Sequence, residues 1–339
     1  AFMMMNRNKK GIALNLKDKD GIEIFKKMVK NSDVVLENFR KGTLEKLGIG
    51  YDVISKINPK IILCEISGYG RTGPYADKGG FDLVAQGMSG LMSITGESKD
   101  KPPMKVGAPI TDITAGLLAT SGILAALVHR NKTGEGQKVD TSLFEAGIVH
   151  TYWQSAIAGA TGQSPGPLGS AHPLTAPYQA FKTMDKWITV GASNQNTWLM
   201  LLKAINRMDL QENEMFSSNF NRKKNITQLV EILNAELIKK TSDEWLKIFD
   251  DNGLPCGPIN SINEMFEDPQ TIEREMIIEV DNKKAGTSKA IGMPIKFSKS
   301  KTEKSKGAPN LGEHTKEIMK IFDYNDEQIE DFYNRKVIL

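Results

Sequence analysis

The residue with the clearest chemical potential in this sequence is a lone carboxylate, Asp112. It lies in "KVGAPITDITAGLLATSGILAAL" (residues 105–127), which we predict to be a strand end running into a helix of small and apolar residues. Burying an uncompensated carboxylate is costly, so the charge needs a reason to be there. One reason is structural, because Thr111 or Asp112 would cap the helix N-terminus. The other is chemical, because the helix dipole keeps the carboxylate ionised, and an ionised, partly desolvated carboxylate is a usable nucleophile.

A second candidate is the basic turn in "LENFRKGTLEKLGIGY" (residues 36–51). Asn38 and Phe39 stand where a predicted strand stops, and Arg40, Lys41 and Lys46 follow. Ligands of α/β folds bind at the carboxyl ends of parallel strands. Exposed N–H groups and lysines there can hold phosphates, and Phe39 can stack on a flat ring. The alternative is a solvated turn between a strand and a helix.

A third candidate, "GYGRTG" (residues 68–73), matches the G-x-G-x-x-G dinucleotide fingerprint and follows a predicted strand. The fingerprint requires a helix whose N-terminus holds the pyrophosphate. Here Pro74, Tyr75 and the polar run "ADKGG" follow instead. The context therefore argues against a nicotinamide oxidoreductase.

Charge is unevenly distributed along the 339 residues, whose formal net charge is +3. The first 50 residues alone hold 11 Lys or Arg against 6 Asp or Glu. This excess is either a solvated face or a docking surface for a polyanionic cofactor. No aromatic residues alternate with the lysines as a stacking platform, so we expect no nucleic-acid partner.

Composition also bounds the location and the cofactors. No apolar run approaches the roughly 18 uninterrupted residues that a membrane-spanning helix needs, and no signal peptide opens the chain. We therefore expect a cytoplasmic protein without a membrane partner. The two cysteines, Cys64 and Cys256, have no metal-type spacing, so we expect both to be reduced and no metal to be bound.

The elements that must position these residues alternate between strands and helices in the first half. Strands are predicted at 11–16, 33–38 and 60–67, with helical patterns between them, and further helices at 112–129 and 142–160. Such alternation predicts an α/β fold with a Rossmann-like parallel sheet covered by helices.

The second half is less regular. Residues 161–177, rich in proline and glycine, are predicted to be a linker or a substrate loop. A smaller α+β unit follows, with a hairpin at 178–192 and helices at 194–206, 226–240 and 242–251. Beyond it, strands are predicted at 276–282 and 291–297, and closing helices at 313–323 and 326–335. The predicted layout is a large domain of residues 1–155 and 290–339, a linker and site loop at 156–176, a small domain at 177–277 and a return linker at 278–289.

Five ordered segments together resemble the class III CoA-transferases, the formyl-CoA transferase and carnitine CoA-transferase family. They are "NRNKKGIALNLKD", "VVLENFRKGTLEKLGIGYD", "NPKIILCEISGYGRTGPYADKGGFDLVAQGMSG", "PITDITAGLLATSGILAAL" and "RNKTGEGQKVDTSLFEA". The resemblance implies that Asp112 attacks a donor acyl-CoA thioester, forming first a mixed anhydride and then an aspartyl-CoA thioester. It also implies that Asp82 lies near this aspartate.

The same resemblance assigns CoA contacts and an assembly. The positions that match CoA-contacting residues are Leu14, Lys17, Asn38, Phe39, Lys46 and Leu47. Family members form interlocked homodimers, so self-association is expected. They also begin a few dozen residues earlier, and we expect this sequence to lack the first strand and helix of the large domain.

One branch of the family, the α-methylacyl-CoA racemases, places a histidine before the aspartate that corresponds to Asp82. Here the position is Phe81, which cannot carry a proton, so racemase chemistry is the less favoured alternative. A non-catalytic CoA-binding protein is a second alternative to a transferase.

The stretches "GSAHPLTAPYQAFKT" and "GLPCGPINSINEMFEDPQ" resemble dicarboxylate-specific transferases. A dicarboxylate acceptor needs a cation for its distal carboxylate, and Arg71 and His172 are the candidates.

Overall fold

The computed structural model describes residues 2–282, 286–300 and 305–339, and its contacts divide the chain into two compact units. The first unit comprises residues 1–82, 111–146 and 262–339, and the second comprises residues 83–110 and 147–261. This division differs from the predicted layout, because residues 83–110 cluster with the second unit and residues 262–277 with the first. The predicted return linker at 278–289 includes residues 283–285, which lie outside the described residues.

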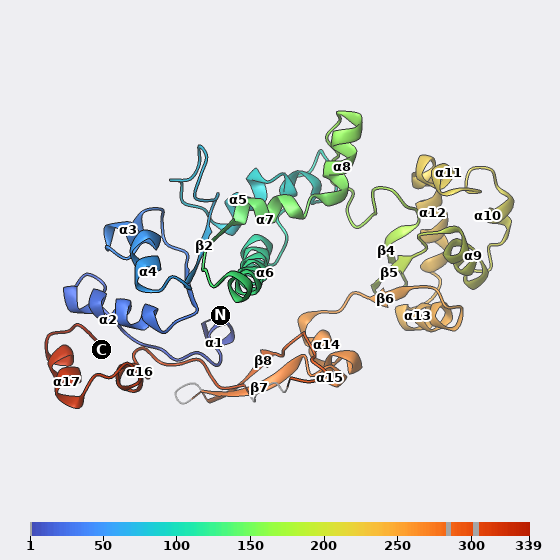
Figure 1. The fold of residues 1–339 in the computed structure, drawn as a ribbon. Coiled ribbons are helices and arrows are strands. Elements are labelled where there is room, and N and C mark those ends of the chain that lie inside the picture. Colours follow the sequence, from blue (N-terminus) through green and yellow to red (C-terminus); the bar gives the residue numbers. More distant parts are fainter. Residues whose placement is uncertain (1, 283–285, 301–304) are drawn as a thin grey trace. The chain divides into compact units, whose positions relative to one another are not determined.

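The first unit is built on a parallel three-stranded sheet (Figure 1). Its strands are β1 (Val34–Glu37), β2 (Ile62–Ser67) and β3 (Lys138–Ser142), in the order β1-β2-β3. The predicted parallel sheet is therefore confirmed. The third strand, "KVDTS", was not predicted, because its charged and hydroxyl side chains lack the apolar pattern of a buried strand.

Two other predicted strands are wrong. Residues 11–16 form only an isolated bridge, between Leu14 and Ile338, because their backbone bonds to the C-terminal segment instead of the sheet: Asn15 N donates to Val337 O at 2.9 Å. Residues 291–297 are not a strand either. The antiparallel pair β7 (Ile277–Asn282) and β8 (Gly286–Ile291) ends at Ile291, and Pro294 has no N–H to continue a ladder.

Helices of the first unit cover the sheet and form two small cores. The predicted helices are present as α2 (Lys19–Lys30), α3 (Thr43–Lys46), α4 (Tyr51–Ile57), α6 (Ile110–Thr133), α16 (Thr315–Ile321) and α17 (Asp326–Asn334), and α1 (Phe2–Met5), α14 (Ile262–Glu267) and α15 (Pro269–Glu273) are added. Val29 of α2 and Ile54 of α4 pack with Ile61 and Leu63 in one core. Ile24 of α2 packs with Met319 and Ile338 in the other.

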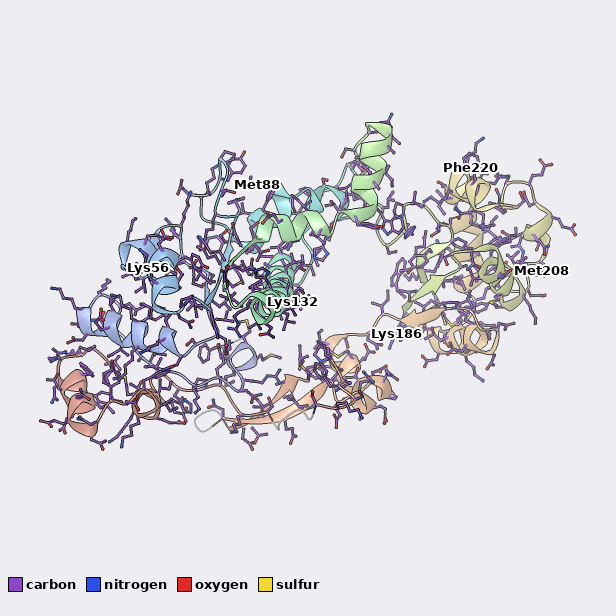
Figure 2. All side chains as sticks on the ribbon, viewed as in Figure 1. Lys56, Met88, Lys132, Lys186, Met208 and Phe220 are labelled. Atoms are coloured by element: carbon purple, nitrogen blue, oxygen red, sulfur yellow. The ribbon has the colours of Figure 1, made fainter. Side chains whose placement is uncertain are left out.

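The second unit has its own larger core. Strands β4 (Tyr178–Lys182), β5 (Trp187–Gly191) and β6 (Cys256–Pro258) form an antiparallel sheet, which confirms the predicted hairpin. Around it lie α9 (Gln195–Ala204), α10 (Asp209–Glu212), α11 (Asn219–Lys224), α12 (Ile226–Leu237) and α13 (Ser242–Asp251), whereas η1 (Leu91–Ile94) belongs to the segment 83–110 of this unit. Trp198, Leu233 and Phe249 are fully buried between sheet and helices, whereas Met208 and Phe220 are exposed on its outer face (Figure 2). The predicted capping box of Thr241 and Glu244 is present.

The division between the units falls within α5, α6 and α7, and a predicted helix is divided. Helix α5 (Asp82–Met88) begins at the last residue of the first segment of unit one, and α7 (Leu143–Val149) leaves the first unit after Ala146. The helix predicted at 142–160 is two helices, α7 and α8 (Tyr152–Thr161). Between them the Thr151 hydroxyl donates to Ile148 O at 2.7 Å, a local bond that competes with helix continuation.

Helix α6 has two different faces. Thr111, Ala115, Ala119 and Ala126 are buried, whereas Ile113, Leu117, Leu124 and Val128, at spacings that share a helix face, are exposed. Among the described helices, α6 alone is long and apolar enough, by length and composition, to cross a membrane, a test that core helices of soluble proteins also pass. The expectation that no apolar segment reaches the length of a membrane-spanning helix is therefore wrong. The Thr, Ser and single Asp residues of α6 lower its mean hydropathy only slightly.

Candidate active site

Two carboxylates meet at the N-terminus of α6. Asp82 Oδ1 accepts hydrogen bonds from the Thr111 backbone N–H at 3.0 Å and from the Thr111 hydroxyl at 2.8 Å. Asp82 thereby caps a helix that lies 29 positions along the chain. Asp112 lies one residue further, in the first turn. Neither Thr111 nor Asp112 is the N-cap residue, since the helix begins at Ile110, so the predicted capping role belongs to Asp82 instead.

The Asp112 carboxylate is exposed and carries a perturbed pKa. Partial desolvation of the Asp112 carboxyl raises its pKa above the ordinary value, and the negative charge of Asp82 raises it further. This direction is opposite to the one expected from the helix dipole alone, since desolvation and the charge of Asp82 both disfavour the ionised form. No hydrogen bond or ion pair joins the Asp112 carboxylate to another of the described side chains, and the residue is exposed.

The loop after β2 delivers Asp82 to this place. Gly68 and Gly80 approach so closely that a Cβ on Gly68 would lie 2.7 Å from Gly80 Cα, a contact that only glycine permits. Gly68 O also accepts from Phe144 N at 3.1 Å, which ties the start of the loop to α7. Phe81, 79% exposed, precedes Asp82 at the position where racemase chemistry would need a histidine. No helix follows "GYGRTG" directly, as its context had indicated.

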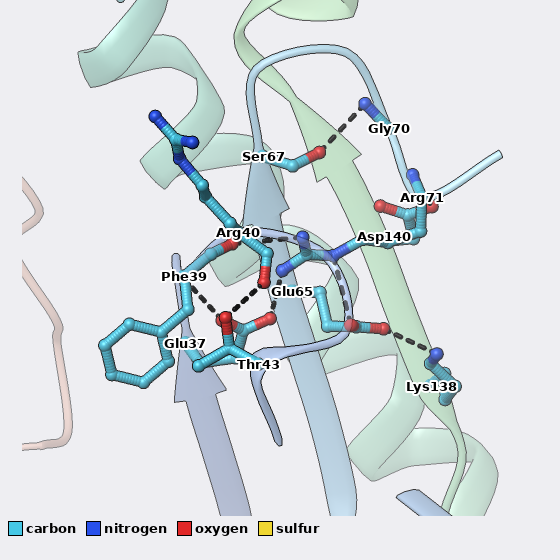
Figure 3. A network of polar contacts seen from close by, with 10 residues as sticks. All are labelled: Glu37, Phe39, Arg40, Thr43, Glu65, Ser67, Gly70, Arg71, Lys138 and Asp140. Atoms are coloured by element: carbon cyan, nitrogen blue, oxygen red, sulfur yellow. Dashed lines mark hydrogen bonds and ion pairs between the residues drawn. The ribbon is translucent and has the colours of Figure 1, made fainter. Parts of the chain in front are cut away.

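Most of the predicted CoA-contacting residues lie at the carboxyl end of β1. Asn38 and Phe39 are exposed immediately after the strand, and 48% of the surface of Phe39 is accessible. Figure 3 shows Phe39 at this strand end. Lys46 ends α3 and is exposed, whereas Leu47 is its C-cap residue and packs partly into the core beneath. The structure thus gathers an aromatic ring, an amide and a cation within one short turn-helix segment.

Leu14 and Lys17 lie in the preceding segment of the same unit. Leu14 is half-buried and packs against the C-terminal core with Met319 and Ile338. Lys17 is exposed. Of this pair only Lys17 presents a side chain that a phosphate can reach directly.

Arg71 is not placed as a free cation. Its side chain is 9% exposed, its Nη1 donates to Phe39 O at 3.0 Å, and its Nη2 pairs with Glu37. Its Nε lies 3.0 Å from Glu65 Oε1, an ion pair without hydrogen-bond alignment. All three guanidinium nitrogens therefore face protein partners. The prediction that Arg71 binds the distal carboxylate of an acceptor is not supported by this arrangement.

His172, in the second unit, lies in an aromatic setting. Its Nδ1 accepts from the backbone N–H groups of Leu174 at 3.1 Å and Thr175 at 3.2 Å, and Trp153 and Tyr178 meet its ring edge-to-face. Burial lowers the pKa of the His172 imidazole, and nearby Lys223 lowers it further. A neutral ring with Nδ1 accepting carries its proton on Nε2, so His172 is a hydrogen-bond donor rather than a cation.

Lys223 is a residue that sequence reasoning missed. Its Nζ donates to His172 O at 3.0 Å, and burial lowers the pKa of its ammonium group. Nothing in "NRKKN" (residues 221–225) distinguishes this lysine from its exposed neighbour Lys224. Within the described part of the chain, no group of three or more His, Cys, Asp or Glu is placed to hold a metal ion.

Comparisons with known proteins point in one direction. The model of CoA-transferase family III matches residues 1–315. A Fusarium pseudograminearum acyl-CoA transferase is 40% identical over 344 residues, which cover 99% of this chain and 74% of the relative. The succinyl-CoA:glutarate CoA-transferase of Mus musculus is 37% identical over 331 residues, covering 97% and 76%. A crystal structure of a CAIB/BAIF family protein from Brucella suis aligns with a TM-score of 0.82 at 34% identity, over 95% of this chain and 84% of that one.

Proposed function

Because this chain belongs to CoA-transferase family III, we propose that it moves CoA from an acyl-CoA thioester to a free carboxylic acid with Asp112 as the nucleophile. The observation that carries the proposal is the position of Asp112 in the first turn of α6. Asp82 satisfies the Thr111 N–H, and the Asp112 carboxylate is left exposed beside it. A carboxylate whose basicity is raised is a stronger nucleophile once ionised.

The steps balance without an external energy source. Asp112 attacks the thioester carbonyl, the C–S bond breaks, and CoA leaves as a thiolate, so that a mixed anhydride of the donor acid and Asp112 remains. The thiolate then attacks the aspartyl carbonyl, which releases the donor acid as its carboxylate and leaves an aspartyl-CoA thioester. The acceptor carboxylate repeats the sequence in reverse and regenerates Asp112. One thioester replaces another, so no ATP is needed, and catalysis comes from positioning and from stabilisation of the developing oxyanions.

We further propose that the donor is succinyl-CoA and the acceptor a dicarboxylate of glutarate size. The support is the similarity to the murine succinyl-CoA:glutarate CoA-transferase, with which 97% of this chain aligns. His172 is the candidate for the distal carboxylate, as a donor through Nε2–H. Lys223, whose charge lies beside the His172 carbonyl, supplies positive potential there.

Chemical trapping tests the role of Asp112. Incubation with succinyl-CoA followed by hydroxylamine or borohydride should modify Asp112, as read by peptide mass spectrometry. Asp112→Ala should abolish both the labelling and the exchange of CoA between acids. Asp52→Ala, which removes an exposed acid from the first turn of α4, is the matched control and should behave as the wild type. Full activity of Asp112→Ala would refute the proposal.

The homodimer expected from the family is also a proposal here. It is supported by the exposed apolar stripe of α6, formed by Ile113, Leu117, Leu124 and Val128. Contiguous exposed apolar surface of this kind marks sites of protein association.

A further inference from the structure

A buried ionic cluster lies at the carboxyl end of the parallel sheet. Glu37 ends β1, Glu65 lies beside it in register on β2, and Arg71 follows in the next loop (Figure 3). Their side chains are 5%, 7% and 9% exposed, respectively. Charges removed from water to this degree are strongly destabilising unless they are paired, so the cluster needs a structural or functional reason.

Two side chains of the cluster form hydrogen bonds with the backbone of one residue, Phe39. Glu37 Oε2 accepts from the Phe39 backbone N–H at 2.5 Å, and Arg71 Nη1 donates to the Phe39 carbonyl at 3.0 Å. Glu37 Oε1 and Arg71 Nη2 then pair with one another. The two side chains thereby hold both polar backbone groups of Phe39 and close a ring of hydrogen bonds around it.

These two hydrogen bonds restrict the backbone of a residue that lies outside helices and strands. Residues 38–40 follow the strand without helical or sheet bonding, and a backbone of this kind has several accessible conformations. With N–H and C=O both held, the direction of its Cα–Cβ bond is fixed. In Figure 3 the Phe39 ring points away from the cluster, as does the side chain of its neighbour Arg40. The ion pair fixes the backbone, and the ring is left for another partner.

A second set of contacts holds Arg71 itself. Its backbone N–H donates to Asp140 Oδ2 at 3.0 Å, and Glu65 is shared between Arg71 and Lys138, whose Nζ lies 2.7 Å from Glu65 Oε2. The loop that carries Arg71 is therefore anchored to β2 and β3 at once. Because β1, β2 and β3 are adjacent, these contacts fix Arg71 relative to the sheet, and Arg71 in turn fixes the turn at Phe39 relative to the sheet.

We propose that Glu37 and Arg71 are positioning residues of the CoA seat, which hold Phe39 so that its ring stacks on the adenine of a CoA thioester. This rests on the proposed function, since it assumes that Phe39 contacts CoA. It reassigns Arg71 from the acceptor carboxylate to the donor's nucleotide end. Fixing a binding group in advance lowers the entropic cost of binding, so loss of the pair weakens CoA binding without touching the chemical step.

Kinetics and binding of three variants separate this role from a general loss of stability. Arg71→Met should raise the Kd for CoA and the KM for the acyl-CoA donor by roughly tenfold, with kcat and the acceptor KM little changed. Arg71→Lys should fall between it and the wild type, because one ammonium pairs with Glu37 but cannot also reach the Phe39 carbonyl in a fork. Lys60→Met is the matched control: it removes an exposed cation from the turn before β2, outside the cluster, and should leave both constants unchanged.

A double-mutant cycle gives the decisive result even if Arg71→Met is less stable. In a Phe39→Ala background, Arg71→Met should produce no further rise in Kd, because the ring that it positions is gone. Additive effects, or a wild-type Kd in Arg71→Met, would overturn the proposal. Failure of the proposed function has a different signature. In that case the wild type transfers no CoA between any succinyl, glutaryl or related pair, whereas calorimetric CoA binding still reports on the seat.

Discussion

Asp82 Oδ1 lies 3.0 Å from the backbone nitrogen of Thr111 and 2.8 Å from the Thr111 hydroxyl, so one carboxylate caps the helix that carries another. The arrangement satisfies an orphan donor of α6 and at the same time places negative charge beside Asp112. Asp112 is consequently held in a less favourable ionised state than a lone first-turn aspartate. Helix capping and a raised pKa of the Asp112 carboxyl are two effects of the same side chain.

The first prediction concerns the pH dependence of transfer. Desolvation and the charge of Asp82 raise the pKa of the Asp112 carboxyl, and the proposed mechanism requires that carboxyl to be ionised. Removal of the charge in Asp82→Asn, which keeps an oxygen that can accept from Thr111, should lower this pKa. The acid limb of the kcat/KM profile should therefore move to lower pH. An acid limb that stays in place would mean that Asp82 acts only as a cap. Asp82→Ala should in addition cost roughly 1 kcal/mol of stability.

The second prediction concerns stability, with the sign fixed by linkage. The folded pKa of Asp112 lies above its ordinary value of 3.8, so its ionised form is disfavoured by folding. The protonated Asp112 carboxyl therefore contributes favourably to the free energy of unfolding. This contribution is complete below the pKa of the unfolded state and is lost as pH rises through the pKa of the folded state. Asp112→Asn, which never ionises, should therefore become more stable than the wild type as pH increases. Urea unfolding at about pH 4 and about pH 7.5 measures the difference. A gap that is constant with pH contradicts the raised pKa.

The third prediction concerns the core of the second unit. Arg222 is buried, and its guanidinium donates to Ala176 O at 2.8 Å, Phe216 O at 3.0 Å and Gln195 Oε1 at 3.1 Å. Arg222→Met leaves these acceptors unpaired and should cost about 3 kcal/mol or more in denaturant unfolding. Exposed Lys224→Met is the control and should change stability by less than about 0.5 kcal/mol.

Limited proteolysis measures the local effect of Arg222→Met on the neighbouring segment. Because Arg222 holds the carbonyl of Ala176, at the end of the Pro- and Gly-rich segment 161–177, cleavage within that segment should accelerate in Arg222→Met. Unchanged cleavage and unchanged stability together would show that these buried hydrogen bonds contribute little.

The fourth prediction concerns self-association. Leu117 and Leu124 lie on the exposed apolar stripe of α6. The double substitution Leu117→Glu, Leu124→Glu should convert a dimer to a monomer in light scattering, because an interface cannot bury unpaired charges cheaply. Lys56→Glu on α4, labelled in Figure 2, adds negative charge to the same unit and should leave the mass unchanged. A wild type that is monomeric without detergent contradicts the proposed dimer.

Local patterns predicted much of the fold because they report what a segment buries. The apolar spacing of α2, the capping box of α13 and the hairpin of β4 and β5 each depend on residues a few positions apart. Strand β3 is not predicted from the sequence, because its polar residues give no apolar pattern along the chain and the strand is defined by its pairing with β2. Residues 11–16 have an apolar pattern but pair with the C-terminal segment, a choice that depends on the topology of the whole unit.

For the candidate site, the sequence by itself determined the chemistry on offer: a carboxylate at a helix start, a basic turn at a strand end, and the family to which these belong. Only the tertiary structure decided what each group does with its neighbours. It placed Asp82 against Thr111 and enclosed Arg71 between Glu37 and Glu65. The reason is physical. Residue type sets which charges exist, whereas pairing and desolvation, which decide their pKa and availability, depend on contacts between segments far apart in the chain.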